Sequence, residues 1–588
     1  MLKSTTSSEA EEIIISNPPP KTSHSEPGVA SRGLNDVKQT FRSAQSSSRA
    51  ANEIDQTKSP YYKEAIRKLK EVFQLDDFRQ NQLKAINATL DAKDAFVLMP
   101  TGGGKSLCYQ LPAVCTGGKT KGLTVVVSPL IALMNDQVHH LQAKGIDVVS
   151  FNSDQGAEGA RVSRARLTGS GKRPDILYVT PERLDKSTDL RSILGRLYKQ
   201  RELARFVIDE AHCVSTWGRD FRDSYQSLKS LRLEYPGIPI MALTATANEQ
   251  VMNDVIDQLG ICGCEMIMQS FNRPNLFYDV RPKLKNVIND IASFIQLHKG
   301  QTGVIYCLSR NKCEEVAKEL RDKYKLKAKH YHAQMSPEDK HKTQAAWQSG
   351  ECEIIVATIA FGMGIDKAVR YVIHHSLPMS MDGYYQETGR AGRDGKDAKC
   401  ILYYTYADTK ILYKLIKDSE KTSEEEKERQ LEGVRAVVKY CQNDVDCRRV
   451  QVLRYFGQGF DPRECHKACN NCLDEREQKT EDMTTAAKSL LNLVQALGRK
   501  ERMTKVQCLD VFRGANVKTI RDKGYDSNPY FGAGAKLSRE HAERLIDQLL
   551  VLDALREECF TNRSGWNNSY VQVGGFRSSL TLSPHSLS

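Results

Sequence analysis

Residues 94–106 read Asp-Ala-Phe-Val-Leu-Met-Pro-Thr-Gly-Gly-Gly-Lys-Ser. The apolar run is typical of a short buried strand, and the residues after Ser106 favour a helix, so the glycines form the turn between the two elements. Such a turn can wrap backbone N–H groups around phosphate oxygens, while Lys105 supplies a positive charge and Ser106 a hydroxyl for Mg²⁺. Met99 stands where the full phosphate-loop pattern has its first glycine. The stretch predicts a nucleotide-binding α/β domain.

A second motif follows in the segment Val207-Ile-Asp-Glu-Ala-His212. At the end of an apolar strand, Asp209 can hold a metal ion directly or through water, and Glu210 can position an attacking water. Either motif alone is compatible with a chance loop or a solvated strand end. Both motifs in this order predict hydrolysis of a nucleoside triphosphate.

The composition is that of a soluble globular protein. The chain has 588 residues, of which 40% are hydrophobic and 27% charged, so we expect about three to five domains. No apolar stretch of about eighteen residues is present, which argues against a membrane span. Because the N-terminus lacks the apolar core of an export signal, the 16 cysteines are expected to be reduced thiols in a cytosolic or nuclear setting.

The formal charge is +12, and the first 58 residues contribute none of it, because they hold seven Lys or Arg and seven Asp or Glu. The excess of positive charge therefore belongs to the remainder of the chain. A positive folded surface favours a polyanion such as nucleic acid. A modestly high isoelectric point is also common in proteins without such a partner, so charge alone leaves the question open.

Short apolar runs alternate with amphipathic stretches in two successive series. This alternation predicts two parallel sheets covered by helices, that is, an α/β fold. In the first series the expected strands, besides the one before the glycines, are 123–127, 176–179, 206–208 and 240–243. In the second series they are 303–306, 328–331, 353–357, 371–374 and 401–404. Only the first series contains a phosphate loop.

Four cysteines, Cys447, Cys465, Cys469 and Cys472, have the spacing C-x17-C-x3-C-x2-C. Four thiolates with two tight intervals suit a closed tetrahedral zinc site, and we assign the zinc a structural role because no ligand position stays open. Cys441 is a nearby alternative ligand that would need a different geometry.

Further segments carry a resemblance to a known family: Ser128-Pro-Leu-Ile-Ala-Leu-Met-Asn-Asp-Gln-Val138, Leu243-Thr-Ala-Thr246 and Gln386-Glu-Thr-Gly-Arg-Ala-Gly-Arg-Asp-Gly395. With the motifs above, they resemble the RecQ-family DNA helicases of superfamily 2 over about residues 60–575, and in particular the short members. The resemblance implies two RecA-like parallel-sheet motor domains, then a helical zinc-binding module and a winged-helix domain.

The resemblance also implies an ATP site shared by the two motor domains. Arg393 is expected to be the arginine finger that stabilises charge on the γ-phosphate, with Arg390 beside it. The expected catalytic residues are Lys105, Asp209, Glu210, Arg390 and Arg393. The expected nucleotide-binding residues are Phe78, Arg79, Gln82, Thr101, Gly102, Gly103, Gly104, Lys105, Ser106 and Gln386, with Mg²⁺ on Ser106 and Asp209. Phe78, Arg79 and Gln82 alone also fit a surface cluster at a helix start.

DNA contacts are expected from three places. Ser128 and Asn135 match a segment that touches the DNA backbone, although Ser128 also suits a plain helix cap. Residues 215–225 resemble the aromatic-rich loop of the family, which implies stacking and phosphate roles for Trp217, Phe221 and Arg222. A Trp packed against the core is the alternative.

This sequence departs from the family pattern at three further positions. Thr216 stands where the family often has Gln, Arg219 stands where it often has His, and Gln334 replaces the usual Gly. Arg219 places a permanent charge where the family usually has a titratable ring. Trp566 precedes an expected strand at 569–573 and suits either a strand-separating wedge or a residue packed under a hairpin.

From the resemblance we expect an ATP-dependent DNA helicase moving 3′-to-5′, serving replication, recombination or repair in the nucleus. DNA is the expected partner, without a membrane and with a possible homo-oligomer; the sequence leaves protein partners open. A nucleotide-switched DNA-binding or strand-annealing protein and an RNA helicase are the alternatives. The expected division is 1–58 disordered tail, 59–275 first helicase domain, 276–408 second helicase domain, 409–480 zinc module, 481–576 winged helix and 577–588 disordered tail.

Overall fold

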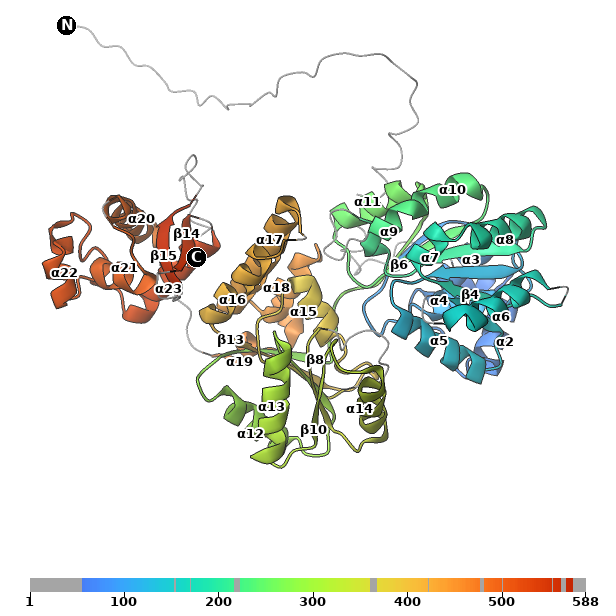
Figure 1. Cartoon of the computed structure of the whole chain (residues 1–588), viewed down its shortest axis with the longest axis horizontal. Coiled ribbons are helices and arrows are strands. Elements are labelled where there is room, and N and C mark those ends of the chain that lie inside the picture. The colour runs from blue at the N-terminus through green and yellow to red at the C-terminus, as the bar shows by residue number, and fades with distance from the viewer. Residues whose placement is uncertain are drawn as a thin grey trace, which may run out of the picture.

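The computed structural model describes residues 55–152, 155–169, 171–215, 223–359, 367, 369–420, 422–475, 481–499, 501–552, 554–561 and 567–574. These residues form two parallel-sheet domains, a helical segment that holds the four spaced cysteines, and a small domain with an antiparallel strand pair (Figure 1). The expected α/β fold is confirmed.

The first sheet has seven parallel strands in the order β3-β4-β2-β5-β6-β1-β7. Its central strands are buried along their whole length, as expected for a parallel sheet with helices on both faces. The strands are β1 Ala95–Leu98, β2 Leu123–Val127, β3 Val148–Phe151, β4 Ile176–Val179, β5 Leu203–Ile208, β6 Ile240–Thr244 and β7 Glu265–Met268.

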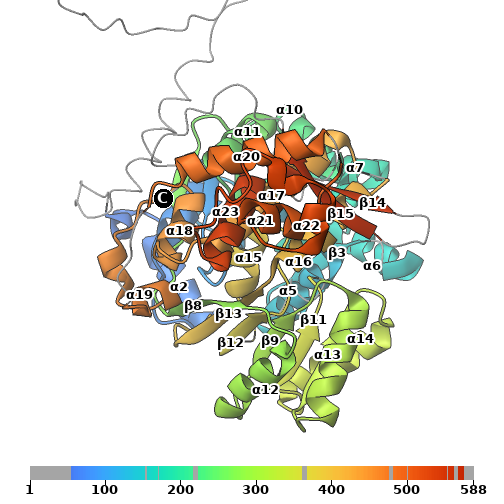
Figure 2. The same ribbon diagram turned by 90° about the vertical axis from the view of Figure 1, so that its left-hand side faces the viewer.

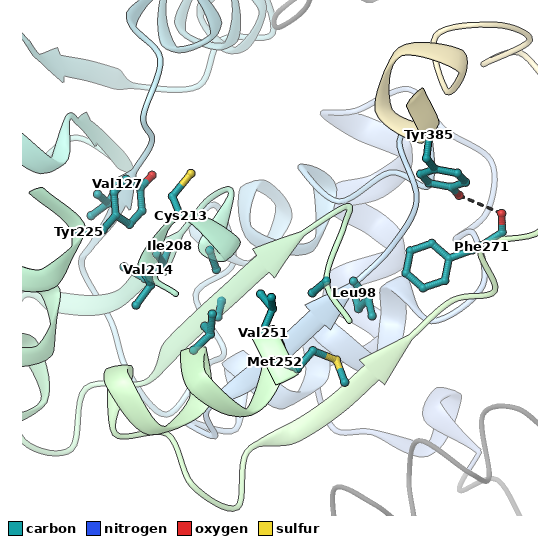
Figure 3. Packing of buried hydrophobic residues seen from close by; sticks show 14 of the residues in the cluster. Leu98, Val127, Ile208, Cys213, Val214, Tyr225, Val251, Met252, Phe271 and Tyr385 are labelled. Atoms are coloured by element: carbon teal, nitrogen blue, oxygen red, sulfur yellow. Dashed lines mark hydrogen bonds between the residues drawn. The ribbon is translucent and has the colours of Figure 1, made fainter. Parts of the chain in front are cut away.

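Within the described part of this domain, ten α-helices accompany the sheet. In α8 the side chain of Ser187 caps the first turn, and the buried residues Leu190, Ile193, Leu194 and Leu197 recur at helical spacing. Figure 3 shows how Leu98 and Ile208 of the sheet pack near Val251 and Met252 of α11. The helices are α2 Tyr62–Glu71, α3 Gln82–Leu90, α4 Leu107–Ala113, α5 Ile131–Ala143, α6 Gly156–Thr168, α7 Pro181–Lys186, α8 Thr188–Lys199, α9 Asp223–Gln226, α10 Ser230–Glu234 and α11 Glu249–Leu259.

In the described residues, the second sheet has six parallel strands in the order β10-β11-β9-β12-β13-β8. Figure 2 shows β8, β13, β12, β9 and β11 in this order. The strands are β8 Leu276–Pro282, β9 Gly303–Tyr306, β10 Ala328–Tyr331, β11 Ile354–Ala357, β12 Tyr371–His374 and β13 Ala398–Tyr404. The helices are α12 Val287–Leu297, α13 Arg310–Asp322, α14 Pro337–Ser349 and α15 Met381–Thr388.

The expected strands of both series are confirmed, with ends shifted by a few residues in β5, β6, β11 and β13. Three described strands were not expected from the sequence: β3, β7 and β8. Strands β3, β7 and β8 lie at sheet edges. The burial of β7 and β8 is incomplete, because one side of an edge strand has no neighbour, so their sequences lack the continuous apolar run of a central strand.

The segment after the second sheet is helical and packs back onto it. It contains α16 Tyr406–Lys417, α17 Glu424–Gln442, α18 Arg448–Tyr455, the short 3₁₀ helix η5 Pro462–Cys465 and α19 Asn470–Leu473. The backbone next to α19 covers the free edge of β8, where the N–H of Tyr278 donates to the carbonyl of Ala468 at 3.3 Å. The cysteine-bearing segment is therefore joined to the second sheet domain. We call residues 406–475 the zinc module.

The last domain contains α20 Thr484–Gly498, α21 Lys505–Phe512, α22 Lys518–Asp522, α23 Arg539–Val551, and the antiparallel pair β14 Leu555–Thr561 and β15 Asn567–Val573. Its apolar helix faces and the start of the strand pair form a core of their own. The domain lies beside α16 and α17 (Figures 1 and 2), where Arg544 Nη2 donates to the carbonyl of Gln442 at 3.1 Å. Helices packed on a small hairpin fit the expected winged helix.

Searching the part of the chain that the structure describes, we find no helix with the length and apolarity needed to span a membrane.

Candidate active site between the two sheet domains

The glycine-rich loop has a backbone that side chains would disturb. Gly102 and Gly104 have φ values of +83° and +86°, in the left-handed region that favours glycine. A Cβ atom on Gly103 would lie 2.9 Å from the carbonyl oxygen of Pro100. The loop leads into α4, with Ser106 at the N-terminal cap. Such a helix start presents N–H groups and a favourable dipole to an anion.

Lys105, Asp209 and Glu210 lie close enough to influence one another's charge. Burial lowers the pKa of Lys105, and the carboxylates Glu210 and Asp209 oppose that shift. Burial, followed by the neighbouring Glu210, raises the pKa of Asp209 to about 7, which Lys105 opposes. In the described conformation, Lys105 Nζ donates to the carbonyl of Met99 at 2.9 Å. The structure thus brings together the cation of the loop and the two carboxylates at the end of β5.

The strand ends behind this cluster are tied to one another. His212 Nδ1 lies 2.9 Å from Thr244 Oγ1 and 3.4 Å from Glu210 Oε2, which connects the ends of β5 and β6. The Tyr225 hydroxyl donates to the carbonyl of Asp209 at 3.0 Å. Tyr225 is the last residue of the aromatic-rich segment, so the two segments meet at the backbone of the expected metal ligand. The sequence did not predict this contact between Tyr225 and the Asp209 backbone.

Arg79 and Gln82 lie against the phosphate loop. Gln82 Nε2 donates to the carbonyl of Gly104 at 3.0 Å, and its Oε1 accepts from the N–H of Arg79 at 2.7 Å. Arg79 Nη1 donates to the carbonyl of Gly102. Phe78 is half-buried beside these residues. The two polar side chains thus hold the loop in this conformation, and an adenine-binding role for the three residues stays a prediction.

The second sheet domain places Arg393 at the same loop, with Arg390 buried three residues before it in the sequence. A Cβ atom added to Gly102 would lie 3.5 Å from the Cγ atom of Arg393. The charge of Arg393 also contributes to the lowered pKa of Lys105. Arg390 is 6% exposed, and among the described residues its Nε and Nη1 atoms have no hydrogen-bond partner. A buried guanidinium with unsatisfied donors suits an anionic ligand. Gln386 lies half-buried on α15, one helical turn before Arg390.

Arg273 joins the two domains at this point, and our sequence-based prediction did not include it. Its Nη1 donates to the carbonyl of Thr101 in the phosphate loop at 3.0 Å, and its Nη2 donates to the carbonyls of Ala391 and Gly392 at 3.0 and 2.9 Å. These last two residues immediately precede the expected arginine finger. The residue belongs to the segment Phe271-Asn-Arg-Pro-Asn-Leu276 between the two sheets, for which we expected no site residue from the sequence.

The expected DNA contacts are only partly described. Trp217, Phe221, Arg222 and Trp566 lie outside the described residues. Asn135 is exposed on α5. Ser128 is 1% exposed, because it continues buried β2, so its hydroxyl cannot reach a DNA strand in this conformation without a movement of its loop.

The four spaced cysteines converge. One ligand atom from each of Cys447, Cys465, Cys469 and Cys472 lies within 4.8 Å of the others, and the Sγ atoms of Cys447 and Cys469 are 3.9 Å apart. The interaction between the Cys447 and Cys469 sulfurs lowers the pKa of Cys469, which favours the thiolate that metals bind. Four sulfur donors from short helix ends fit a structural Zn²⁺ site. Cys441 is buried on α17 and is not part of this group.

A second group of potential ligands lies in the second sheet domain. One atom each of Glu314, His330 and His332 lies within 4.8 Å of the others. His332 Nε2 is 2.9 Å from Glu314 Oε1, and the two imidazole rings stack with centroids 5.4 Å apart. Hydrogen bonding and ring stacking account for this arrangement without an ion.

Family models match nearly all of the described chain. In order, they are the DEAD/DEAH box helicase at 79–255, the helicase conserved C-terminal domain at 283–395, RecQ zinc-binding at 406–473 and the RQC domain at 477–580. The first two matches fall on the two sheet domains, and the third covers the four cysteines.

Relatives of known name are similar over most of the chain. The ATP-dependent DNA helicase hus2/rqh1 of Schizosaccharomyces pombe is 48% identical over 88% of this chain and 39% of the relative. The ATP-dependent DNA helicase Q1 of Mus musculus is 37% identical over 90% of this chain and 80% of the relative. The chain thus spans about two fifths of the yeast relative and four fifths of the mouse relative.

Proposed function

Because the chain belongs to the RecQ family of helicases, we propose that it is an ATP-dependent DNA helicase that hydrolyses ATP between its two sheet domains. The observation that carries this proposal is the position of Arg393, which the second domain places against the phosphate loop of the first. A site completed by two domains couples hydrolysis to their relative movement, because bound ATP favours closure and its hydrolysis relaxes it.

The proposed roles follow from the geometry. The N–H groups of residues 101–106 and the ammonium of Lys105 bind the phosphates, and Glu210 orients the attacking water. Ser106 and Asp209 have the donor atoms to hold Mg²⁺, which would neutralise charge on the phosphates. Arg390 and Arg393 stabilise the charge that develops on the γ-phosphate oxygens. Phe78, Arg79, Gln82 and Gln386 complete the nucleotide site.

We propose DNA as the substrate, with movement 3′-to-5′ and separation of duplex or branched DNA. The zinc module and the winged helix would hold duplex, and the aromatic-rich segment and Asn135 would contact the single strand. The Tyr225 bond to Asp209 gives that segment a direct route to the hydrolysis site. Trp566 would act as a wedge at the hairpin. We also propose action in the nucleus, in replication, recombination or repair, and possible self-association.

Two assays test the proposal. ATP turnover is measured with and without single-stranded DNA, and unwinding is measured on a duplex with a 3′ tail. We expect DNA to stimulate turnover, and Lys105→Ala to abolish turnover while DNA binding persists. An active Lys105→Ala protein would refute the assignment of the phosphate loop.

The same assays separate the alternatives. A nucleotide-switched binding or annealing protein would bind DNA without ATP-dependent unwinding, although it would not need Glu210 and Arg393 in these positions. An RNA helicase would turn over faster on RNA than on DNA, although it would not need the zinc module and winged helix. Turnover on matched DNA and RNA strands distinguishes these cases.

A further inference from the structure

The linker between the two sheet domains, residues 270–276, is held by the zinc module. The ring of Phe271 stacks on that of Phe456, with centroids 4.5 Å apart and planes 13° apart. Gln458 accepts a hydrogen bond from the N–H of Phe271 at 2.9 Å and donates to Ser270 Oγ at 2.6 Å. On its other side, the linker accepts a bond from Tyr385 of α15 to the carbonyl of Phe271 at 2.9 Å (Figure 3).

The centre of the linker wraps around the guanidinium of Arg449. Arg449 Nη1 donates to Asn272 Oδ1 at 2.8 Å and to the carbonyl of Arg273 at 2.6 Å, and Nη2 donates to the carbonyl of Leu276 at 2.8 Å. Arg449 is 2% exposed and follows Cys447 by two residues in the sequence. A planar guanidinium with several fixed donors can hold consecutive carbonyl groups in one arrangement, which a lysine ammonium cannot reproduce.

The Arg273 side chain extends from the held segment in the opposite direction. As described above, it donates to Thr101 in the phosphate loop and to Ala391 and Gly392 beside the arginine finger. A continuous series of contacts therefore runs from a zinc ligand through Arg449 and the linker backbone to both halves of the ATP site. Catalytic geometry is sensitive to displacements of about 1 Å, so the linker position matters for hydrolysis.

We propose that Arg449 is a positioning residue for ATP hydrolysis: it fixes the linker so that Arg273 holds the phosphate loop and the arginine-finger loop in register. Zinc contributes by fixing the start of α18, from which Arg449 projects. This inference rests on the proposed function and adds a task for the zinc module, beyond folding, at the hydrolysis site.

The test compares Arg449→Met, Arg273→Met and the double variant in the full chain. The matched control is Arg454→Met, because Arg454 lies on the same helix with its side chain 70% exposed. Zinc content, kcat and KM for ATP with single-stranded DNA are measured. We expect Arg449→Met to retain zinc and lower kcat by about tenfold or more, with a smaller change in KM. In the double variant, kcat should fall little below that of Arg273→Met, because both changes act through one contact.

Hydrogen exchange gives a readout that needs no activity. Peptides covering 270–276 should exchange faster in Arg449→Met than in the wild type and in Arg454→Met. An unchanged kcat with unchanged exchange would overturn the inference, and multiplicative effects in the double variant would overturn the route through Arg273. If the wild type shows no ATP turnover, the proposed function fails, and hydrogen exchange still decides whether Arg449 holds the linker.

Asn272→Ala and Gln458→Ala provide the test if Arg449→Met fails to fold. Both side chains are only half-buried. Asn272→Ala removes the oxygen that accepts from Arg449, and Gln458→Ala removes the hydrogen bonds to Phe271 and Ser270 of the same linker. We expect each to lower kcat with zinc retained. Full activity in both would overturn the inference.

Discussion

Tyr225→Phe tests whether the aromatic-rich segment communicates with the hydrolysis site through the backbone of Asp209. The change removes one hydroxyl, whose hydrogen bond to the Asp209 carbonyl is 3.0 Å long. The ring is buried among apolar residues, including Val127, Cys213 and Val214 (Figure 3), and phenylalanine preserves that packing. The substitution therefore isolates the hydrogen bond.

The expected magnitude follows from burial. A hydrogen bond contributes about 0.5–1.5 kcal/mol net, and a buried carbonyl left unsatisfied costs about 1–3 kcal/mol. We expect a loss of about 1–2 kcal/mol in stability, which lowers the midpoint of thermal unfolding by about 2–8 °C for a domain of this size. If most of that energy acts in the DNA-bound transition state, DNA-stimulated kcat falls by about tenfold.

The assay measures ATP turnover with and without single-stranded DNA. Tyr198→Phe is the control, because the Tyr198 hydroxyl donates to the Pro236 carbonyl at 2.9 Å, a bond of the same kind away from the site. We expect the basal rate to change less than the stimulated rate in Tyr225→Phe, and neither to change in Tyr198→Phe. Equal stimulation by DNA in Tyr225→Phe and wild type would refute the route through Asp209.

Three other results are expected. Gly104→Ala should raise KM for ATP, because its φ of +86° strains an L residue, whereas Gly145→Ala, at a φ of +74° with nothing within 4 Å of the added carbon, should not; equal KM values would count against the loop geometry. Because burial raises the pKa of Asp209 to about 7, its carboxyl becomes protonated as pH falls through that value. Mg²⁺ affinity, measured by titration with ATP, should therefore weaken by about tenfold between about pH 8 and about pH 6, and a flat profile would argue against Asp209 as a ligand. Cys469→Ser should lose zinc and lower the unfolding temperature, while Cys441→Ser should keep zinc by metal analysis; zinc retained in Cys469→Ser would disprove the ligand set.

Both layered domains and their central strands follow from the sequence because a strand buried on two faces must be apolar throughout. The runs 123–127 and 371–374 show this, and the structure has both as β2 and β12. The sequence pattern did not predict strand β8, because its residues Leu-Phe-Tyr-Asp-Val-Arg-Pro include charged residues that an edge position tolerates. Its partner at the edge is the backbone around Ala468, which lies far along the chain.

For the proposed ATP and zinc sites, the local chemistry of each motif is encoded in short segments: glycines for the backbone of residues 102–104, carboxylates at a strand end, and cysteines at metal-binding intervals. Such features depend on neighbours within a few residues, so one sequence suffices to predict them. Contacts among distant segments are different, since they depend on how the domains pack. Arg273, Arg449 and Tyr225 act through backbone carbonyls, which every residue possesses and which therefore leave no trace in residue type. Only the folded chain reveals which carbonyls those side chains reach.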